Sequence, residues 1–111
     1  MSLFIAKIRK QELLQERSQL HWQMLAITNA KANATKAATE LMQVGTDYEN
    51  DSVIAKNLQV RQYKLKLLEE QLDKQKAEIE ERIQEVETEM QSVDKMIQSA
   101  IKESFSYNIA A

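Results

Sequence analysis

The chain has 111 residues, a formal net charge of −2, one glycine, and no proline or cysteine. With 43% hydrophobic and 29% charged residues it has the composition of a folded soluble protein, so disorder is not expected. The shortage of turn-forming residues excludes a sheet with several tight turns. The absence of cysteine excludes disulfides, thiolate metal sites and cysteine nucleophiles. These totals predict an all-α fold.

The first residues, MSLFIAKIRKQELL, place charged side chains inside any apolar stretch. We therefore predict no secretory signal and no membrane anchor there, and no transmembrane segment in the chain. The corresponding expectation is a cytoplasmic protein, or one exported without a cleaved signal peptide.

Residues 3–44 are predicted to form one helix with an apolar seam. Arg17 and Lys31 fall on this seam, where a long basic side chain can lay its stem along apolar surface. The apolar members, at spacings of three, four or seven residues, are Leu13, Leu20, Met24, Ile27, Ala34, Ala38 and Leu41.

Residues 53–103 are predicted to form a second helix with a stronger seam in two frames. The first frame contains Ile54, Leu58, Leu65, Leu68, Leu72 and Ile79. The second contains Ile83, Val86, Met90, Val93 and Ile97. A slip of four residues between the frames predicts a stutter, which would locally unwind a supercoil.

Residues 45–52 are predicted to form the turn between the helices. Gly45 suits the left-handed position just past a helix end, and Thr46 to Glu49 has the spacing of a capping box. The second helix could also start slightly later, because Asn50, Asp51 and Ser52 are further cap formers. We predict a long antiparallel helical hairpin of the coiled-coil type, with a continuous rod as the alternative.

Charge favours the hairpin. If the chain reverses near residue 48, Lys7, Arg9, Lys10 and Arg17 come level with residues 80–90, the most acidic segment. An unbroken parallel homodimer would instead stack these glutamates on one another.

Several apolar residues lie outside the seam and predict a further neighbour. On the second helix these residues are Val53, Val60, Tyr63 and Leu67, and on the first they are Trp22 and Leu25. Two apolar faces on one helix indicate two neighbours, so we expect a homo-oligomeric bundle, with a different protein partner as an alternative. The competing interpretation is that the aromatic residues are scattered on the surface.

Residues 104–111 are predicted to form an extended or mobile tail. Phe105, Tyr107 and Ile109 alternate with small or polar residues, a spacing typical of a strand. Such a segment could add to the sheet edge of a partner or insert its apolar side chains into a groove, or it could be a frayed terminus.

No residue pattern predicts chemistry, so we expect no enzyme, cofactor or metal site. His21 has no converging ligands, and the acidic side chains from Glu78 to Asp94 lack the looped geometry of a calcium site. A weak nucleic-acid or membrane-surface interaction through Lys7, Arg9, Lys10 and Arg17 is the least favoured alternative, because Glu12 and Glu16 lie among them.

In length and hairpin form the chain resembles small helical proteins that accompany bacterial export machines. These include flagellar-type export adaptors and stalks, needle and rod subunits of type III secretion, and helical substrates of type VII secretion. The resemblance implies an adaptor or an exported subunit as an alternative to a structural, self-associating protein. It carries over no functional residue, because Trp22 lies within a helix and Gly45 lacks the tryptophan of the type VII turn.

Overall fold

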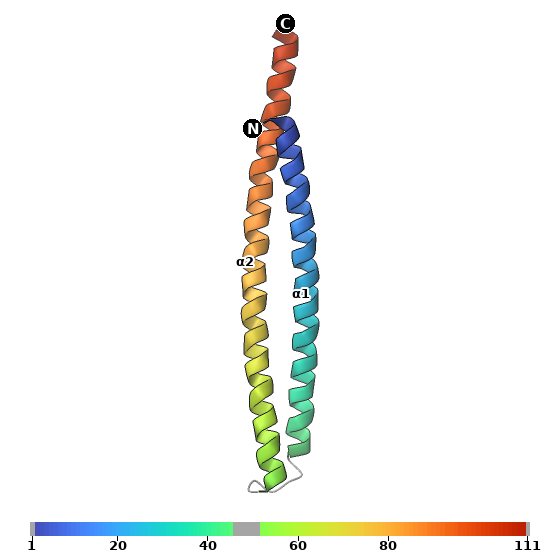
Figure 1. The fold of residues 1–111 in the computed structure, drawn as a ribbon, viewed down its shortest axis with the longest axis vertical. Coiled ribbons are helices and arrows are strands. Elements are labelled where there is room, and N and C mark those ends of the chain that lie inside the picture. The colour runs from blue at the N-terminus through green and yellow to red at the C-terminus, as the bar shows by residue number, and fades with distance from the viewer. Residues whose placement is uncertain (1, 46–51, 111) are drawn as a thin grey trace. The chain divides into compact units, whose positions relative to one another are not determined.

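The computed structural model describes the backbone of residues 2–45 and 52–110, with side chains through Ser106. Two helices make up this part of the chain, α1 (Leu3–Gly45) and α2 (Val53–Ala110), and they form a hairpin (Figure 1). No strand occurs among the described residues. The predicted all-α helical hairpin is therefore confirmed, and the continuous rod is wrong.

The hairpin divides into two compact units, each built from both helices. Unit 1 contains Met1–Trp22 and Glu80–Ala111, and unit 2 contains Gln23–Ile79. In each unit a stretch of α1 runs antiparallel to a stretch of α2.

A serine begins each helix. The backbone N–H of Ile5 donates to Oγ of Ser2 at 3.2 Å, and that of Ala55 donates to Oγ of Ser52 at 3.0 Å. Each hydroxyl thus satisfies an amide that has no partner within its own helix, as an N-cap does. The later start of the second helix at Ser52 is confirmed, whereas the Thr46–Glu49 capping box lies outside the described residues.

Gly45 differs from its prediction. It is the last residue of α1, and no glycine among the described residues has a positive φ. A Cβ added at Gly45 would lie 3.9 Å from Nε2 of Gln62 and 4.0 Å from Cδ1 of Leu58, which is ordinary van der Waals contact. Neither backbone conformation nor space therefore requires glycine here, and the predicted left-handed cap is wrong.

The seam of α1 lies where it is predicted. Leu13, Leu20 and Ala34 are buried, and Arg17 and Lys31 are half-buried as expected. The other predicted members are half-buried: Met24, Ile27, Ala38 and Leu41. Ala6, also buried, continues the same seven-residue spacing toward the start of the helix. The packed face therefore begins one heptad earlier than predicted.

The predicted stutter in α2 is wrong. Burial recurs at alternating spacings of three and four without interruption, at Ala55, Leu58, Gln62, Leu65, Glu69, Leu72, Lys76, Ile79, Ile83, Val86, Met90, Val93, Ile97 and Ala100. The apparent slip between Ile79 and Ile83 arises because every second seam position from residue 62 to residue 76 is polar. Gln62, Glu69 and Lys76 occupy these positions. Ile54 and Leu68, 50% and 41% exposed, lie beside the seam that they were expected to join.

The helix α2 continues to Ala110, so the prediction of an extended segment from residue 104 is wrong for residues 104–110. The segment contains neither proline nor glycine, and nothing in it stops a helix that is already formed. In a helix, residues four apart share one face, so Phe105 lies on the same face as Ile101. The alternation of Phe105, Tyr107 and Ile109 that is typical of a strand therefore does not define a face here. Within unit 1 this end of α2 extends past the start of α1, and residues 101–106 are all exposed (Figure 1).

Leu13 and Leu14 provide a test of this seam, because they are adjacent leucines that are 0% and 38% exposed. We expect Leu13→Ala to lower the free energy of unfolding by about 3 kcal/mol, since it removes buried methyl groups and leaves a cavity. Leu14→Ala should lower it by less than about 1 kcal/mol. Urea unfolding followed by circular dichroism measures both variants, and equal losses would contradict the assigned face.

Candidate interaction surfaces

Ion pairs join the basic start of α1 to the acidic part of α2 within unit 1. Arg9 donates from Nε and Nη2 to one carboxylate oxygen of Glu89, at 2.8 and 2.6 Å, and also bonds Glu12 on its own helix. Nζ of Lys10 lies 2.8 Å from Oδ1 of Asp94. The predicted pairing of the basic turn with the acidic segment is therefore confirmed for Arg9 and Lys10.

One heptad further along α1, the acidic and basic partners exchange helices. Arg82 donates from Nε to Oε1 of Glu16 at 2.8 Å, so here the acid is on α1 and the base on α2. The seven residues from Arg9 to Glu16 are matched by the seven from Glu89 back to Arg82, as antiparallel pairing requires. Arg82, which precedes the seam residue Ile83, is thus a partner in an ion pair beside the seam.

A further ion pair, in unit 2, joins Lys31 of α1 to Asp73 of α2. The hydrogen bond to Asp73 is the main cause that raises the pKa of Lys31, and the nearby charge of Glu69 adds to it. Glu89 raises the pKa of Arg9 in the same way, and Glu16 that of Arg82. Solvent screens all these groups, so the pairs select the register of the helices more than they stabilise the fold.

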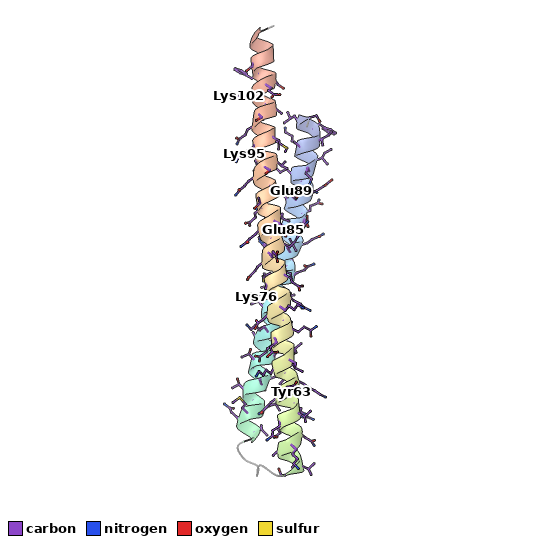
Figure 2. All side chains as sticks on the ribbon, turned by 90° about the vertical axis from the view of Figure 1, so that its left-hand side faces the viewer. Tyr63, Lys76, Glu85, Glu89, Lys95 and Lys102 are labelled. Atoms are coloured by element: carbon purple, nitrogen blue, oxygen red, sulfur yellow. The ribbon has the colours of Figure 1, made fainter. Side chains whose placement is uncertain are left out.

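The apolar stripe that is predicted to meet another chain is exposed in unit 2. Val53, Val60, Tyr63 and Leu67 all lie outside the seam of α2, and Tyr63 is labelled in Figure 2. Val60, Tyr63 and Leu67 follow one another at spacings of three and four, so they share one helical face. We call these four residues the outer stripe.

Trp22 and Leu25 are also exposed, and Trp22 retains 70% of its accessible surface. Trp22 belongs to unit 1 and Leu25 to unit 2. Both therefore lie outside the seam, but neither belongs to the outer stripe, which is on α2, and their contact with a partner stays a prediction.

The predicted residues at the C-terminus lie on a helix. Phe105 is exposed, whereas the side chains of Tyr107 and Ile109 are outside the described part of the chain. The sequence reasoning missed three exposed apolar residues at the start of α1: Phe4, Ile5 and Ile8. Their exposure could have been predicted from the sequence, since all three fall outside the seven-residue spacing of Ala6, Leu13 and Leu20.

His21 and the hollows on α2 lie on helix surfaces. His21 is exposed, and no group of three or more His, Cys, Asp or Glu side chains could hold a metal ion in this part of the chain. Two hollows on α2 are each lined by this helix alone, one by Ser92, Lys95, Met96, Ser99, Ala100 and Glu103, and the other by Ser99, Lys102, Glu103 and Ser106. A surface of one helix does not surround a small ligand as a binding pocket does.

The basic residues near the start of α1 are partly engaged. Arg9 and Lys10 already pair with acidic residues of α2, whereas Lys7 and Arg17 form no ion pair among the residues that the structure describes. Few charges are thus left on this segment for a phosphate backbone or an anionic surface. In the described helices, no stretch is long and apolar enough to cross a membrane.

Comparisons of the chain with protein-family models, with curated proteins and with solved structures find no significant match.

The Lys10–Asp94 pair can be tested by exchanging its charges. We expect Lys10→Glu to lower the stability by up to about 1 kcal/mol, since the attraction becomes repulsion at an exposed site. The exchange Lys10→Glu with Asp94→Lys should restore most of this loss. Lys7→Glu is the matched control, because Lys7 is a nearby lysine without a described ion pair. Thermal unfolding measures all four proteins, and a loss in the control equal to that in Lys10→Glu would contradict the pairing.

Proposed function

We propose that the chain is a non-enzymatic coiled-coil structural or adaptor protein, which acts by associating with its own copies and by presenting helices to protein partners. The observation that supports this proposal is the outer stripe. The seam of α2 already packs against α1 in unit 2, whereas Val53, Val60, Tyr63 and Leu67 have no cover.

Limited burial within the hairpin also supports association. Ala6, Leu13 and Val86 are the apolar residues described as 0% exposed, and all three belong to unit 1. Each ordered residue costs about 1.5 kcal/mol of conformational entropy, while buried apolar surface contributes only about 25 cal/mol per Å². Covering the outer stripe would add burial without ordering a new helix.

The double variant Val60→Glu with Leu67→Glu tests self-association through the outer stripe. Both side chains are exposed, so the hairpin should keep its helical content. Association should weaken, because two charged groups would have to be desolvated at the interface. Light scattering coupled to size-exclusion chromatography gives the mass, and circular dichroism gives the helical content.

The matched control is Met42→Glu with Val44→Glu, which changes two exposed apolar residues of α1 in the same unit. Loss of association in the outer-stripe variant alone would support the proposal. A wild-type chain that is monomeric at all concentrations, or an outer-stripe variant of unchanged mass, would refute self-association through this stripe.

A further inference from the structure

Charges on α2 are segregated along unit 2. From Val53 to Leu68 the helix carries four basic residues, Lys56, Arg61, Lys64 and Lys66, and no acidic one. Acidic residues begin at Glu69 and continue at Glu70, Asp73 and Glu78, together with Lys74 and Lys76. The outer stripe lies entirely in the basic segment, so a partner that covers it must supply negative charge.

No ion pair within the described residues neutralises the basic segment. None of its four basic side chains forms an ion pair among the described residues, whereas Asp73 is paired with Lys31. Glu69 and Lys76 occupy half-buried seam positions, but Glu70 and Glu78 are exposed. The same helix therefore holds both unpaired bases and unpaired acids on surfaces that α1 leaves open.

The positions of these charges are symmetric about Leu67. Lys64 lies three residues before it and Glu70 three residues after it, while Lys56 and Glu78 lie eleven residues before and after. An antiparallel helix of the same sequence that crosses at Leu67 would thus bring opposite charges together at each of these positions. A self-complementary surface of this kind is what a two-fold dimer interface requires.

We propose that two copies of the chain pair through their α2 helices, antiparallel and about a two-fold axis at Leu67. This inference rests on the proposed self-association and specifies its geometry. Lys64 meets Glu70 of the second copy and Lys56 meets its Glu78, and each contact occurs twice. Leu67 packs against Leu67 of the second copy. Val60 lies seven residues before Leu67 and Lys74 seven residues after it, so Val60 packs under the aliphatic stem of Lys74 of the second copy.

A parallel pairing is disfavoured by the same charges. In a parallel pair each residue would meet the same residue of the second copy. Lysine would then face lysine at positions 56 and 64, and glutamate would face glutamate at positions 70 and 78. A different, wholly acidic partner would satisfy the basic segment but would leave Glu70 and Glu78 facing negative charge. The second copy is thus the partner whose charges match both segments.

Charge reversal in the full chain tests this geometry. We expect Lys64→Glu and Glu70→Lys each to weaken dimerisation on the order of tenfold at low salt, because each change replaces two attractions by two repulsions per dimer. The double exchange should restore the wild-type dissociation constant. Rescue cannot come from within one chain, because helical residues six apart do not face each other.

Lys66→Glu is the matched control, since the position symmetric to Lys66 about Leu67 is the uncharged Leu68. Sedimentation equilibrium gives the dissociation constant of each variant, and circular dichroism verifies its helical content. The control should dimerise as the wild type does, and added salt should weaken the wild-type dimer only partly, because the apolar contacts at Leu67 persist.

The outcomes separate this inference from the proposed function. A wild-type chain that associates, but with no effect from either single reversal, would overturn the two-fold pairing and leave self-association standing. Weakening in both single variants without rescue in the double exchange would also overturn it, because Lys64 and Glu70 would then both affect association without meeting each other. A wild-type chain that remains monomeric would refute both proposals.

Discussion

A helix that has only one neighbour can cover only one of its faces, and this constraint governs the structure. In each unit α1 and α2 share one seam, so about half of the apolar seam residues are buried, the others are half-buried, and few lose all of their accessible surface. The hollows described on α2 are lined by one helix and do not surround a ligand. Every apolar residue outside the seam is necessarily presented to solvent, which makes the outer faces the surfaces available for function.

The ion pairs beside the seam supply what the apolar pattern cannot. A seam that repeats every seven residues looks the same after the helices slide by one heptad, so burial alone does not define their alignment. Such a slide would bring Arg9 level with Arg82, or Glu16 level with Glu89. Because Arg9 is basic and Glu16 acidic, a slide of one heptad would place like charges together. The two pairs thus disfavour this misaligned state, even though each exposed pair contributes little energy.

Helix type, the seam of α1 and the antiparallel pairing follow from composition, periodicity and charge, since all three signals are local or repetitive. The stutter was an error because Gln62, Glu69 and Lys76 hide half of the repeat, and a half-buried position tolerates a polar tip. The C-terminal helix was missed because Phe105, Tyr107 and Ile109 match a strand spacing, whereas continuation of α2 depends on the helix already formed before them. Exposure of Trp22 and the outer stripe was predictable, because these residues lie outside the seven-residue spacing of the seam.

The antiparallel arrangement also gives the hairpin an order of assembly. Gly45 and Leu58 approach each other across a short stretch of chain, whereas Arg9 and Glu89 are separated by 80 residues. Closing a longer loop costs more entropy, so contacts of unit 2 can form before those of unit 1 and shorten the loop that unit 1 must close. The fully buried Leu13 and Val86 lie in unit 1. We therefore expect the tightest packing to form after unit 2, and changes to it to act mainly on the rate of unfolding.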